Sequence, residues 1–218
     1  MQKILVTGFE PFDGDSINPS LEAIRLLASH RTAGVQIVVA PLPVSAEHIT
    51  ATLRHVLHEH RPDAVIAVGQ AGGRTEVSVE RIAINIDDFR IPDNDGAQPV
   101  DEPVVPGGPA AYFSTLPIKA IAQRMRDTGV PAQVSQTAGT FLCNHVFYLV
   151  CHLAATEFPG MRAGFIHVPA LPEQAARNPG MCSMALETIV AGLKVAIETV
   201  RDVTVAARGR RTEPGYST

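Results

Sequence analysis

The chain has 218 residues, 45% of them hydrophobic, with 17 glycines, 17 prolines and a formal net charge of −4. This composition is typical of a globular protein with many turns, and the length suits one domain that buries a sizeable core without disulfides or a metal. The acidic balance excludes the basic surface on which nucleic acids and anionic membranes are bound, so we expect neither as a partner.

Strands and helices alternate along the first part of the sequence. Short apolar runs predict buried strands at residues 3–7, 35–40 and 64–68. The first helix is expected to begin at Pro19 with Asn18 as its cap, and the second to run from a cap at Ser45 to His60. This order predicts a parallel sheet with helices on its faces.

The pattern changes in the middle of the chain. Residues 76–87 alternate apolar and polar side chains with one phase slip, which predicts a long bulged strand or a hairpin. Residues 88–109 are rich in proline, glycine and aspartate. A loop of this length inside a compact domain is usually functional.

The last part of the chain adds strands and helices without a repeat or an interdomain linker. The predicted elements are a helix at 117–127 ended by Gly129, a strand at 132–136, a helix after residue 143, a strand at 163–168 and a closing helix at 181–200. We therefore predict one domain over residues 1–207. The basic cluster at 208–211 opens a polar terminus, residues 208–218, that we expect to be a flexible tail.

Cysteine is scarce and unclustered. Cys143, Cys151 and Cys182 suggest neither a disulfide framework nor a CxxC metal pair, and they suit a reducing compartment. The N-terminal segment is too short for a signal peptide, and no apolar run approaches the roughly 20 residues that cross a membrane. We expect a cytoplasmic protein.

Cys143 lies where a predicted strand turns into a helix. At a helix N-terminus a thiol faces unpaired backbone N–H groups and the positive end of the helix dipole, which stabilise a thiolate and can hold an oxyanion. Cys143 is therefore a candidate nucleophile. The alternative is a small buried hydrophobic residue.

A cysteine nucleophile needs a base, and the base usually needs a third group to orient it. His167 lies near the C-terminal end of an apolar strand, where ligands gather in open α/β sheets. Glu80 interrupts a run otherwise suited to burial, and a buried carboxylate needs a partner. The alternatives are a structural histidine and a salt bridge from Glu80 to Arg74 or Arg81.

Two loops that follow predicted strands are candidates for ligand contact. Phe9 and Phe12 follow the first strand, and they indicate either a pocket for a small, flat, uncharged group or a loop packed onto the core. Residues 69–74 could line a ligand or form a flexible turn. Residues 93–96 resemble part of a calcium loop but lack the later glutamate, so we predict no metal site.

Five segments of the sequence occur together in a fixed order. They are GFEPF at 8–12 with NPS at 18–20, VGQA at 68–71, ERIAIN at 80–85 through RIPDN at 90–94, AGTFLCN at 138–144, and GFIHVP at 164–169. In this order they resemble the pyroglutamyl-peptidase I, or pyrrolidone-carboxylate peptidase, family of cysteine peptidases. The resemblance spans most of the chain, whereas a single segment would be a weak signal.

The resemblance implies a triad of Cys143, His167 and Glu80. It implies removal of an N-terminal pyroglutamyl residue from peptides through an acyl-enzyme, without a metal or organic cofactor. The implied fold is a single-domain, three-layer αβα sandwich with a mostly parallel, mixed sheet, and the implied assembly is a homotetramer.

The same resemblance implies the residues that bind substrate. Phe9 and Phe12 would enclose the lactam ring, and Asn18 and Gln70 would recognise its polar edge. Arg90 lies in a matching stretch near the site and is the remaining candidate for a substrate contact.

Two other functions stay open from the residues alone. A non-catalytic small-molecule binding domain on the same scaffold would carry no thiol of unusual reactivity. Another thiol amidase, such as a glutamine amidotransferase domain, would carry its cysteine between closely spaced glycines, whereas Cys143 is flanked by Leu142 and Asn144.

Overall fold

Buried apolar runs form the strands of the main sheet, as the sequence predicts. In this computed structural model, which describes the backbone of residues 1–210 and the side chains of residues 1–204, β1 (Gln2–Phe9) pairs in parallel with β2 (Val35–Leu42) and β3 (Ala64–Gln70). β3 pairs in parallel with β8 (Arg162–Val168). β1, β3 and β8 are buried almost throughout because helices cover both faces of the sheet.

The other side of the sheet contains the only change of strand direction among these six strands. β4 (Val77–Glu80) pairs antiparallel with β8 and parallel with β7 (Ala132–Ser135), which gives the strand order β2-β1-β3-β8-β4-β7. The sheet is therefore mixed and mostly parallel, as predicted.

The predicted long strand or hairpin over residues 76–87 is wrong. A separate two-stranded antiparallel sheet consists of β5 (Ile82–Ile84) and β6 (Ala111–Phe113). The chain leaves the main sheet at Arg81, where the phase slip lies in the sequence. Val79 packs in the core on one face of the main sheet and Ala83 in the core on the other, so the slip marks a change of layer.

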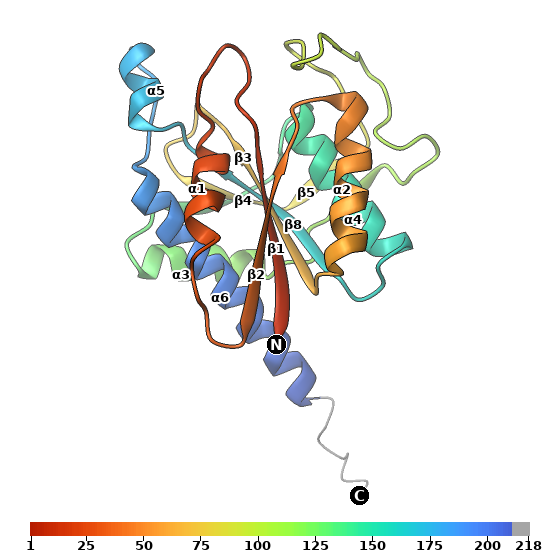
Figure 1. The fold of residues 1–218 in the computed structure, drawn as a ribbon, viewed down its shortest axis with the longest axis vertical. Coiled ribbons are helices and arrows are strands. Elements are labelled where there is room, and N and C mark those ends of the chain that lie inside the picture. Colours follow the sequence, from red (N-terminus) through yellow and green to blue (C-terminus); the bar gives the residue numbers. More distant parts are fainter. Residues whose placement is uncertain (211–218) are drawn as a thin grey trace, which may run out of the picture.

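Helices on both faces confirm the expected three-layer αβα arrangement (Figure 1). One face carries α1 (Pro19–Leu27), α3 (Ile118–Asp127) and α6 (Leu186–Arg210), and the other carries α2 (Ala46–His60) and α4 (Leu142–Thr156). Each helical layer buries its apolar stripe against the sheet. A fully buried leucine such as Leu53 of α2 stabilises the fold by roughly 1.5–3 kcal/mol relative to an exposed one.

The predicted helix caps are confirmed. Asn18 Oδ1 accepts a hydrogen bond from the N–H of Ser20 at 3.0 Å, and Ser45 Oγ accepts one from the N–H of His48 at 3.2 Å. Gly129 follows α3 with a φ of +84°, a left-handed conformation that favours glycine.

The segment after β8 differs from its prediction. A short helix, α5 (Pro172–Arg177), follows the strand, and α6 begins at Leu186 rather than at residue 181. The start of the helix is delayed because the N–H of Met184 donates to the carbonyl of Ala170 at 2.9 Å, which holds this stretch against the end of β8.

α6 continues to Arg210, beyond the expected domain end at residue 207. The predicted tail begins at residue 208, and its residues 211–218 lie outside the part that the structure describes. Among the helices of the described residues, none combines the length and apolar character required to cross a bilayer.

The loop of residues 88–109 lies beside the N-terminal ends of α2 and α4 (Figure 1) and contains no helix or strand, as predicted. Asp93 Oδ2 accepts a hydrogen bond from the N–H of Ala46 at 2.7 Å, which ties the loop to the first residue of α2. Asp93 Oδ1 accepts from the N–H groups of Asp95 and Ala97 at 2.9 and 2.8 Å. This carboxylate therefore organises the loop through backbone contacts.

Candidate active site

Cys143 is the second residue of α4. The helix begins at Leu142 after an extended Phe141, so the N–H groups of Leu142, Cys143 and Asn144 have no carbonyl partner within the helix. The predicted place of the cysteine at a helix N-terminus is confirmed.

The two residues after the cysteine anchor the start of α4. Asn144 is 1% exposed, and its Oδ1 accepts a hydrogen bond from the N–H of Ile84 at 3.0 Å. Its Nδ2 donates to the carbonyls of Ile84 and Ile86, each at 2.9 Å. His145 Nδ1 lies 2.7 Å from Asp87 Oδ2. The sequence analysis missed both residues, and their signal is an adjacent polar pair at the start of an otherwise apolar helix.

His167 and Glu80 form a buried hydrogen-bonded pair. The antiparallel register of β4 and β8 aligns Ser78 with His167, which puts Glu80 at the diagonal position on the same face. His167 Nδ1 lies 2.8 Å from Glu80 Oε1, and the two residues are 3% and 0% exposed. Because a carboxylate only accepts, Nδ1 carries the proton and Nε2 keeps its lone pair.

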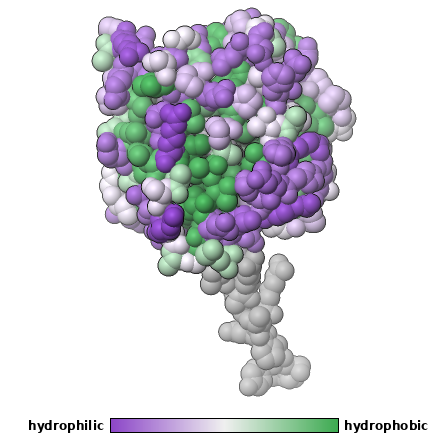
Figure 2. Space-filling model, in the orientation of Figure 1, coloured by the Kyte–Doolittle hydropathy of each residue, from purple (hydrophilic) through white to green (hydrophobic). Residues whose placement is uncertain are grey.

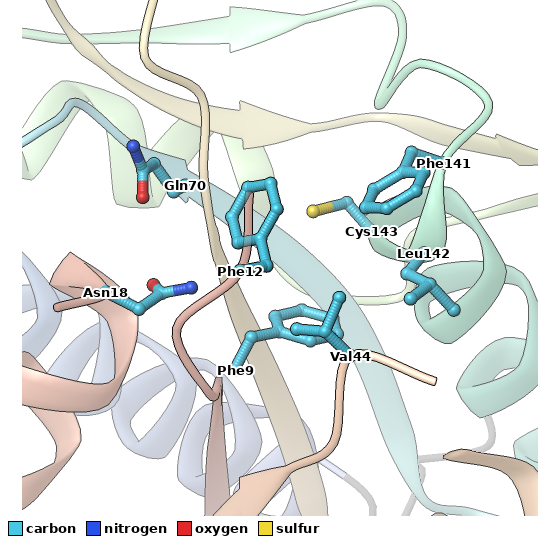
Figure 3. A pocket seen from close by; sticks show the side chains of 8 residues that line it. All are labelled: Phe9, Phe12, Asn18, Val44, Gln70, Phe141, Leu142 and Cys143. Carbon is cyan, nitrogen blue, oxygen red and sulfur yellow. The ribbon is translucent and has the colours of Figure 1, made fainter. Parts of the chain in front are cut away.

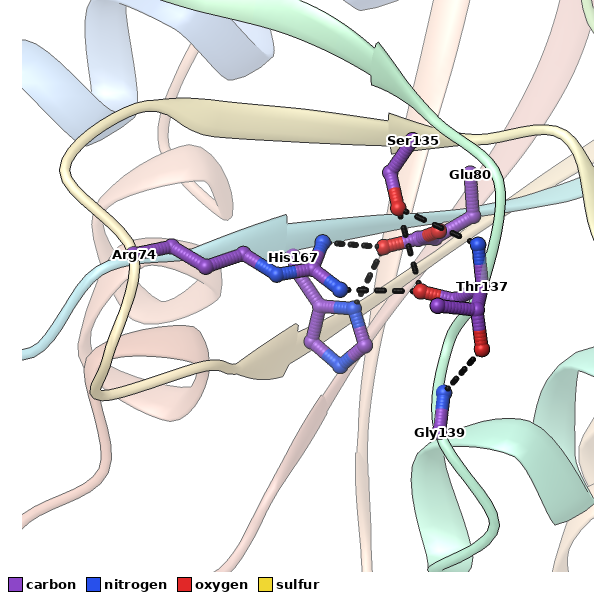
Figure 4. A network of polar contacts seen from close by, with 6 residues as sticks. All are labelled: Arg74, Glu80, Ser135, Thr137, Gly139 and His167. Atoms are coloured by element: carbon purple, nitrogen blue, oxygen red, sulfur yellow. Dashed lines mark hydrogen bonds and ion pairs between the residues drawn. The ribbon is translucent and has the colours of Figure 1, made fainter.

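Arg74 joins Glu80 to the segment that leads into α4 (Figure 4). Its guanidinium donates to Glu80 Oε1 at 2.5 Å and to the carbonyl of Thr137 at 2.8 Å. Ser135 Oγ donates to the same carbonyl at 3.0 Å. The salt bridge that was the alternative to a triad role for Glu80 therefore coexists with the His167 contact, and both use Oε1.

Cys143 and His167 open into the same cleft. The structure records no hydrogen bond between the cysteine sulfur and the histidine ring, although both side chains line this space. Arg90 lines the cleft as well, and its exposed guanidinium makes no ion pair with the residues that the structure describes.

Burial is the main cause of the shifted pKa values of Cys143 and His167. The pKa of the Cys143 thiol is raised to about 12, chiefly because burial removes the thiolate from water; the charge of Glu80 acts in the same direction and Arg74 opposes it. Burial also lowers the pKa of His167, while the hydrogen bond and charge of Glu80 raise it. The free protein therefore holds Cys143 as a thiol at neutral pH, and stabilisation of its thiolate by the helix N-terminus stays a prediction.

An apolar pocket, which shares Phe12, Gln70, Phe141 and Cys143 with the cleft, also adjoins the sulfur (Figure 3). Its lining consists of Phe9, Phe12, Asn18, Val44, Gln70, Phe141, Leu142 and Cys143, none of which is charged when the cysteine is a thiol. The sulfur points toward the side on which Phe12 lies. The cavity volume is about 10 Å³, room for roughly one water molecule, so the pocket is nearly closed in the free protein.

Phe9 and Phe12 occupy different environments within this pocket. Phe9 is 3% exposed, and its ring centroid lies 6.4 Å from that of Phe165, so it belongs to the core as well as to the pocket wall. Phe12 is half-buried and lies 6.0 Å from the ring of Phe141, centroid to centroid. The sequence analysis missed Phe141, which also contacts Phe89 with ring centroids 4.6 Å apart.

Asn18 and Gln70 lie on the polar side of the pocket, and protein contacts fix both amides. Asn18 Oδ1 accepts from the N–H and the Oγ of Ser20, while its Nδ2 donates to the carbonyl of Glu10 at 3.0 Å. Figure 3 shows the Asn18 amide nitrogen directed toward the pocket, so its second N–H is the group that it offers. Gln70 Oε1 accepts from Nε2 of the fully buried Gln174 at 3.2 Å.

Residue 69, just before Gln70, must be a glycine because Cys143 and Phe165 leave no room for a side chain. A Cβ at this position would lie 2.8 Å from Cys143 Sγ and 2.7 Å from Cζ of Phe165. Van der Waals contacts are optimal at about 3.5–4.0 Å, so only glycine lets the sulfur and the Phe165 ring pack over β3.

The structure brings all eight predicted site residues to one end of the sheet. Seven of them line the pocket or the cleft, and Glu80 is hydrogen-bonded to His167, which lines the cleft. Among the described residues, no group of three or more histidine, cysteine, aspartate or glutamate side chains has the arrangement of a metal site.

A family model described as pyroglutamyl peptidase matches residues 2–203 of the chain. Pyrrolidone-carboxylate peptidase 1 of Ralstonia nicotianae is 57% identical over 199 residues, which cover 91% of this chain and 93% of that protein. Pyrrolidone-carboxylate peptidase of Levilactobacillus brevis is 50% identical over 198 residues, with 91% and 97% covered.

Solved structures agree with these sequence matches. The crystal structure of pyroglutamyl peptidase I from Bacillus amyloliquefaciens superposes with a TM-score of 0.89 at 44% identity, covering 92% of this chain and 97% of that one. Pyrrolidone carboxyl peptidase from Thermococcus litoralis superposes with a TM-score of 0.91 at 40% identity, covering 95% and 96%.

Proposed function

The chain belongs to the pyroglutamyl peptidase family, and from this premise we propose that it hydrolyses the bond after an N-terminal pyroglutamyl residue through Cys143 and an acyl-enzyme. The observation that carries this mechanism is the position of the sulfur. Cys143 lines both an uncharged pocket and a cleft that contains His167, and His167 is hydrogen-bonded to Glu80.

The charge states of the free protein indicate how the reaction begins. Cys143 starts as a thiol and His167 as a neutral imidazole. When the carbonyl of the scissile amide bond lies against the sulfur, His167 Nε2 takes the thiol proton as the C–S bond forms. Glu80 then stabilises the imidazolium. Catalytic hydrogen bonds are often long until substrate binds, which accounts for the absent contact between sulfur and ring.

The later steps restore the starting protonation states of Cys143 and His167, with the thiol proton leaving on the amine and a proton from water replacing it. The tetrahedral intermediate collapses, the C–N bond breaks, and His167 Nε2 gives its proton to the leaving amine. Water then attacks the thioester while His167 takes one of its protons. The thioester C–S bond breaks, pyroglutamate is released, and the sulfur recovers its proton from His167.

The N–H groups at the start of α4 support the oxyanion. The N–H of Cys143 has no partner within the helix, and the positive end of the helix dipole faces the developing charge. Arg90 lines the cleft, and its guanidinium makes no ion pair with the residues that the structure describes, so we assign it a contact with the substrate there.

The pocket favours a lactam over an ordinary N-terminal residue. A pyroglutamyl ring is small and carries no ammonium, and the pocket offers aromatic walls and no carboxylate. Asn18 presents an N–H to the lactam carbonyl, and Gln70 contributes on the same polar side. A charged prolyl ammonium of similar size would lose its hydration there without a counter-charge.

The test is hydrolysis of a chromogenic pyroglutamyl amide beside the matching prolyl amide. The wild-type protein should cleave the first and not the second, and Cys143→Ala and Cys143→Ser should cleave neither, because no sulfur nucleophile remains. Cys151→Ala is the matched control, since this buried cysteine lies in the same helix and is absent from the lining of the pocket and the cleft. Pyroglutamyl cleavage that survives both Cys143 changes would contradict the proposal.

We also propose assembly into a homotetramer, as the family resemblance implies. β2 is an edge strand of the sheet. The groove beside it is mostly apolar and is lined by Glu10, Pro11, Leu21, Ile24, Arg25, Val39 and Pro41. Figure 2 shows hydrophobic surface gathered over this region of α1 and β2. Light scattering after size exclusion should give a tetrameric mass, and Val39→Asp should lower it; a monomeric wild-type protein would contradict the assembly.

We further propose that the protein acts in the cytoplasm. The mechanism needs a reduced sulfur, and Cys143, Cys151 and Cys182 are all free thiols. Cell fractionation should place the activity with cytoplasmic markers, and activity confined to an oxidising compartment would contradict this location.

A further inference from the structure

Arg74 is a charged side chain that contacts the Glu80 carboxylate and a second part of the site at once. It lies in the loop after β3, and its two terminal nitrogens reach Glu80 Oε1 and the carbonyl of Thr137, 63 residues away in sequence (Figure 4). We propose that Arg74 is a positioning residue of the triad, whose guanidinium fixes the Glu80 carboxylate against His167 and ties it to the segment leading into Cys143. This inference rests on the proposed function.

The burial of Glu80 makes a counter-charge necessary. Glu80 is 0% exposed, and its Oε2 is buried without a hydrogen-bond partner among the described residues. Both of its contacts therefore fall on Oε1, one from Arg74 and one from His167. A neutral imidazole alone is a weak partner for a carboxylate that has lost its water, so the guanidinium supplies the counter-charge that this buried group needs.

Arg74 also holds the approach to the nucleophile. Residues 135–139 connect β7 to the turn before α4, and the carbonyl of Thr137 accepts from both Arg74 and Ser135. The planar guanidinium can serve two acceptors in a fixed geometry, which a lysine ammonium cannot reproduce. The same side chain therefore sets the place of the carboxylate and of the chain that leads to Cys143.

The charge of Arg74 has a measurable consequence at His167. The titratable or charged groups that face this imidazole are Glu80 of β4, Arg74 and Cys143, with Arg90 lining the same cleft. The charge of Arg74 lowers the pKa of His167 and opposes the effect of Glu80. Without Arg74, His167 gains a proton more readily. The active form, which has a neutral His167, is therefore lost at a higher pH.

Arg81 provides a matched control. It follows Glu80 directly in sequence, and its Nε donates to Gln136 Oε1 at 2.8 Å, so it contacts the same 135–139 segment without reaching the carboxylate. An effect of Arg74 that operates through general surface charge would appear equally in Arg81→Met.

The experiment is the pH dependence of kcat/KM for a pyroglutamyl amide in wild type, Arg74→Met, Arg74→Lys and Arg81→Met. We expect the acidic limb of Arg74→Met to move upward by about one pH unit. Arg74→Lys should keep the limb near that of wild type but lower kcat, and Arg81→Met should change neither. If Arg74→Met does not fold, Arg74→Gln takes its place with the same expectation.

A second readout does not depend on peptide hydrolysis. The rate at which iodoacetamide alkylates Cys143 at neutral pH should fall in Arg74→Met, because Arg74 opposes the rise in the pKa of the thiol. An acidic limb that stays at the wild-type pH in a folded Arg74→Met would overturn the inference, as would an equal shift in Arg74→Lys. A wild-type protein that cleaves no pyroglutamyl amide would contradict the proposed function instead, and the alkylation rates would still decide the role of Arg74.

Discussion

Gly69→Ala adds a single methyl group beneath Cys143 Sγ, the proposed nucleophile, and tests whether the position of the sulfur controls the reaction. The new Cβ would lie 2.8 Å from Cys143 Sγ and 2.7 Å from Cζ of Phe165. Optimal contact distances are about 3.5–4.0 Å, so one or both neighbours must retreat by roughly 1 Å. Phe165 is fully buried in the core, which leaves the half-buried cysteine as the group more able to move.

The expected magnitude follows from that displacement. A shift of about 1 Å at a reacting atom lowers the rate by about 100-fold, because the near-attack geometry is lost. Overpacking against Phe165 should also cost about 1–3 kcal/mol of stability. We therefore expect a folded protein with a kcat/KM about 100-fold below that of wild type.

The assay is hydrolysis of a chromogenic pyroglutamyl amide, with thermal unfolding measured beside it. Gly73→Ala is the control, in the loop that follows β3, because a Cβ there would meet no heavy atom within 4 Å. It should retain wild-type activity. A Gly69→Ala protein that folds and cleaves substrate at the wild-type rate would refute the argument that the sulfur is held by close packing over β3.

Three further predictions concern the anchor of α4, the pocket and pH. Asn144→Ala removes the side-chain contacts to Ile84 and Ile86, and it should lower the stability by about 2 kcal/mol and Tm by roughly 5 °C, with a loss of kcat; an unchanged Tm would contradict the anchoring role. Phe12→Ala should raise KM and leave Tm almost unchanged, because Phe12 is half-buried and lines the pocket. A KM equal to that of wild type would exclude Phe12 from substrate binding. The pKa of His167 is lower in the folded protein than its ordinary value of 6.5, so the unfolded chain binds the proton first and stability falls as pH drops through 6.5 toward the folded pKa. Urea unfolding should show that the free energy of unfolding falls less between about pH 7.5 and about pH 5.5 in His167→Gln than in wild type. An equal fall in both proteins would contradict burial of a neutral His167.

The sequence predicts those features of the fold that depend on near neighbours in the chain. Apolar runs mark β1, β3 and β8, and the caps at Asn18 and Ser45 mark the starts of two helices. The start of α4 near Cys143 follows from the same local signals. These predictions succeed because burial on both faces of a strand, and side-chain capping of a helix, involve residues only a few positions apart.

The errors lie where distant parts of the chain decide the outcome. The alternation over residues 76–87 is the same whether the chain continues in one sheet or enters another. α6 starts later than expected because Met184 pairs with Ala170. Helical spacing alone does not reveal either contact.

The candidate site shows the same division. The sequence by itself identifies Cys143, His167 and Glu80 as unusual residues in their local settings, and the ordered motifs indicate the family. Only the tertiary structure brings His167 to Glu80, 87 residues away in sequence, through the antiparallel register of β4 and β8. It also adds Arg74 to the carboxylate and surrounds the sulfur so that desolvation raises the pKa of the Cys143 thiol. The physical reason is that backbone propensity acts over one or two turns of chain, whereas charge, desolvation and contact distance depend on whatever the fold packs alongside.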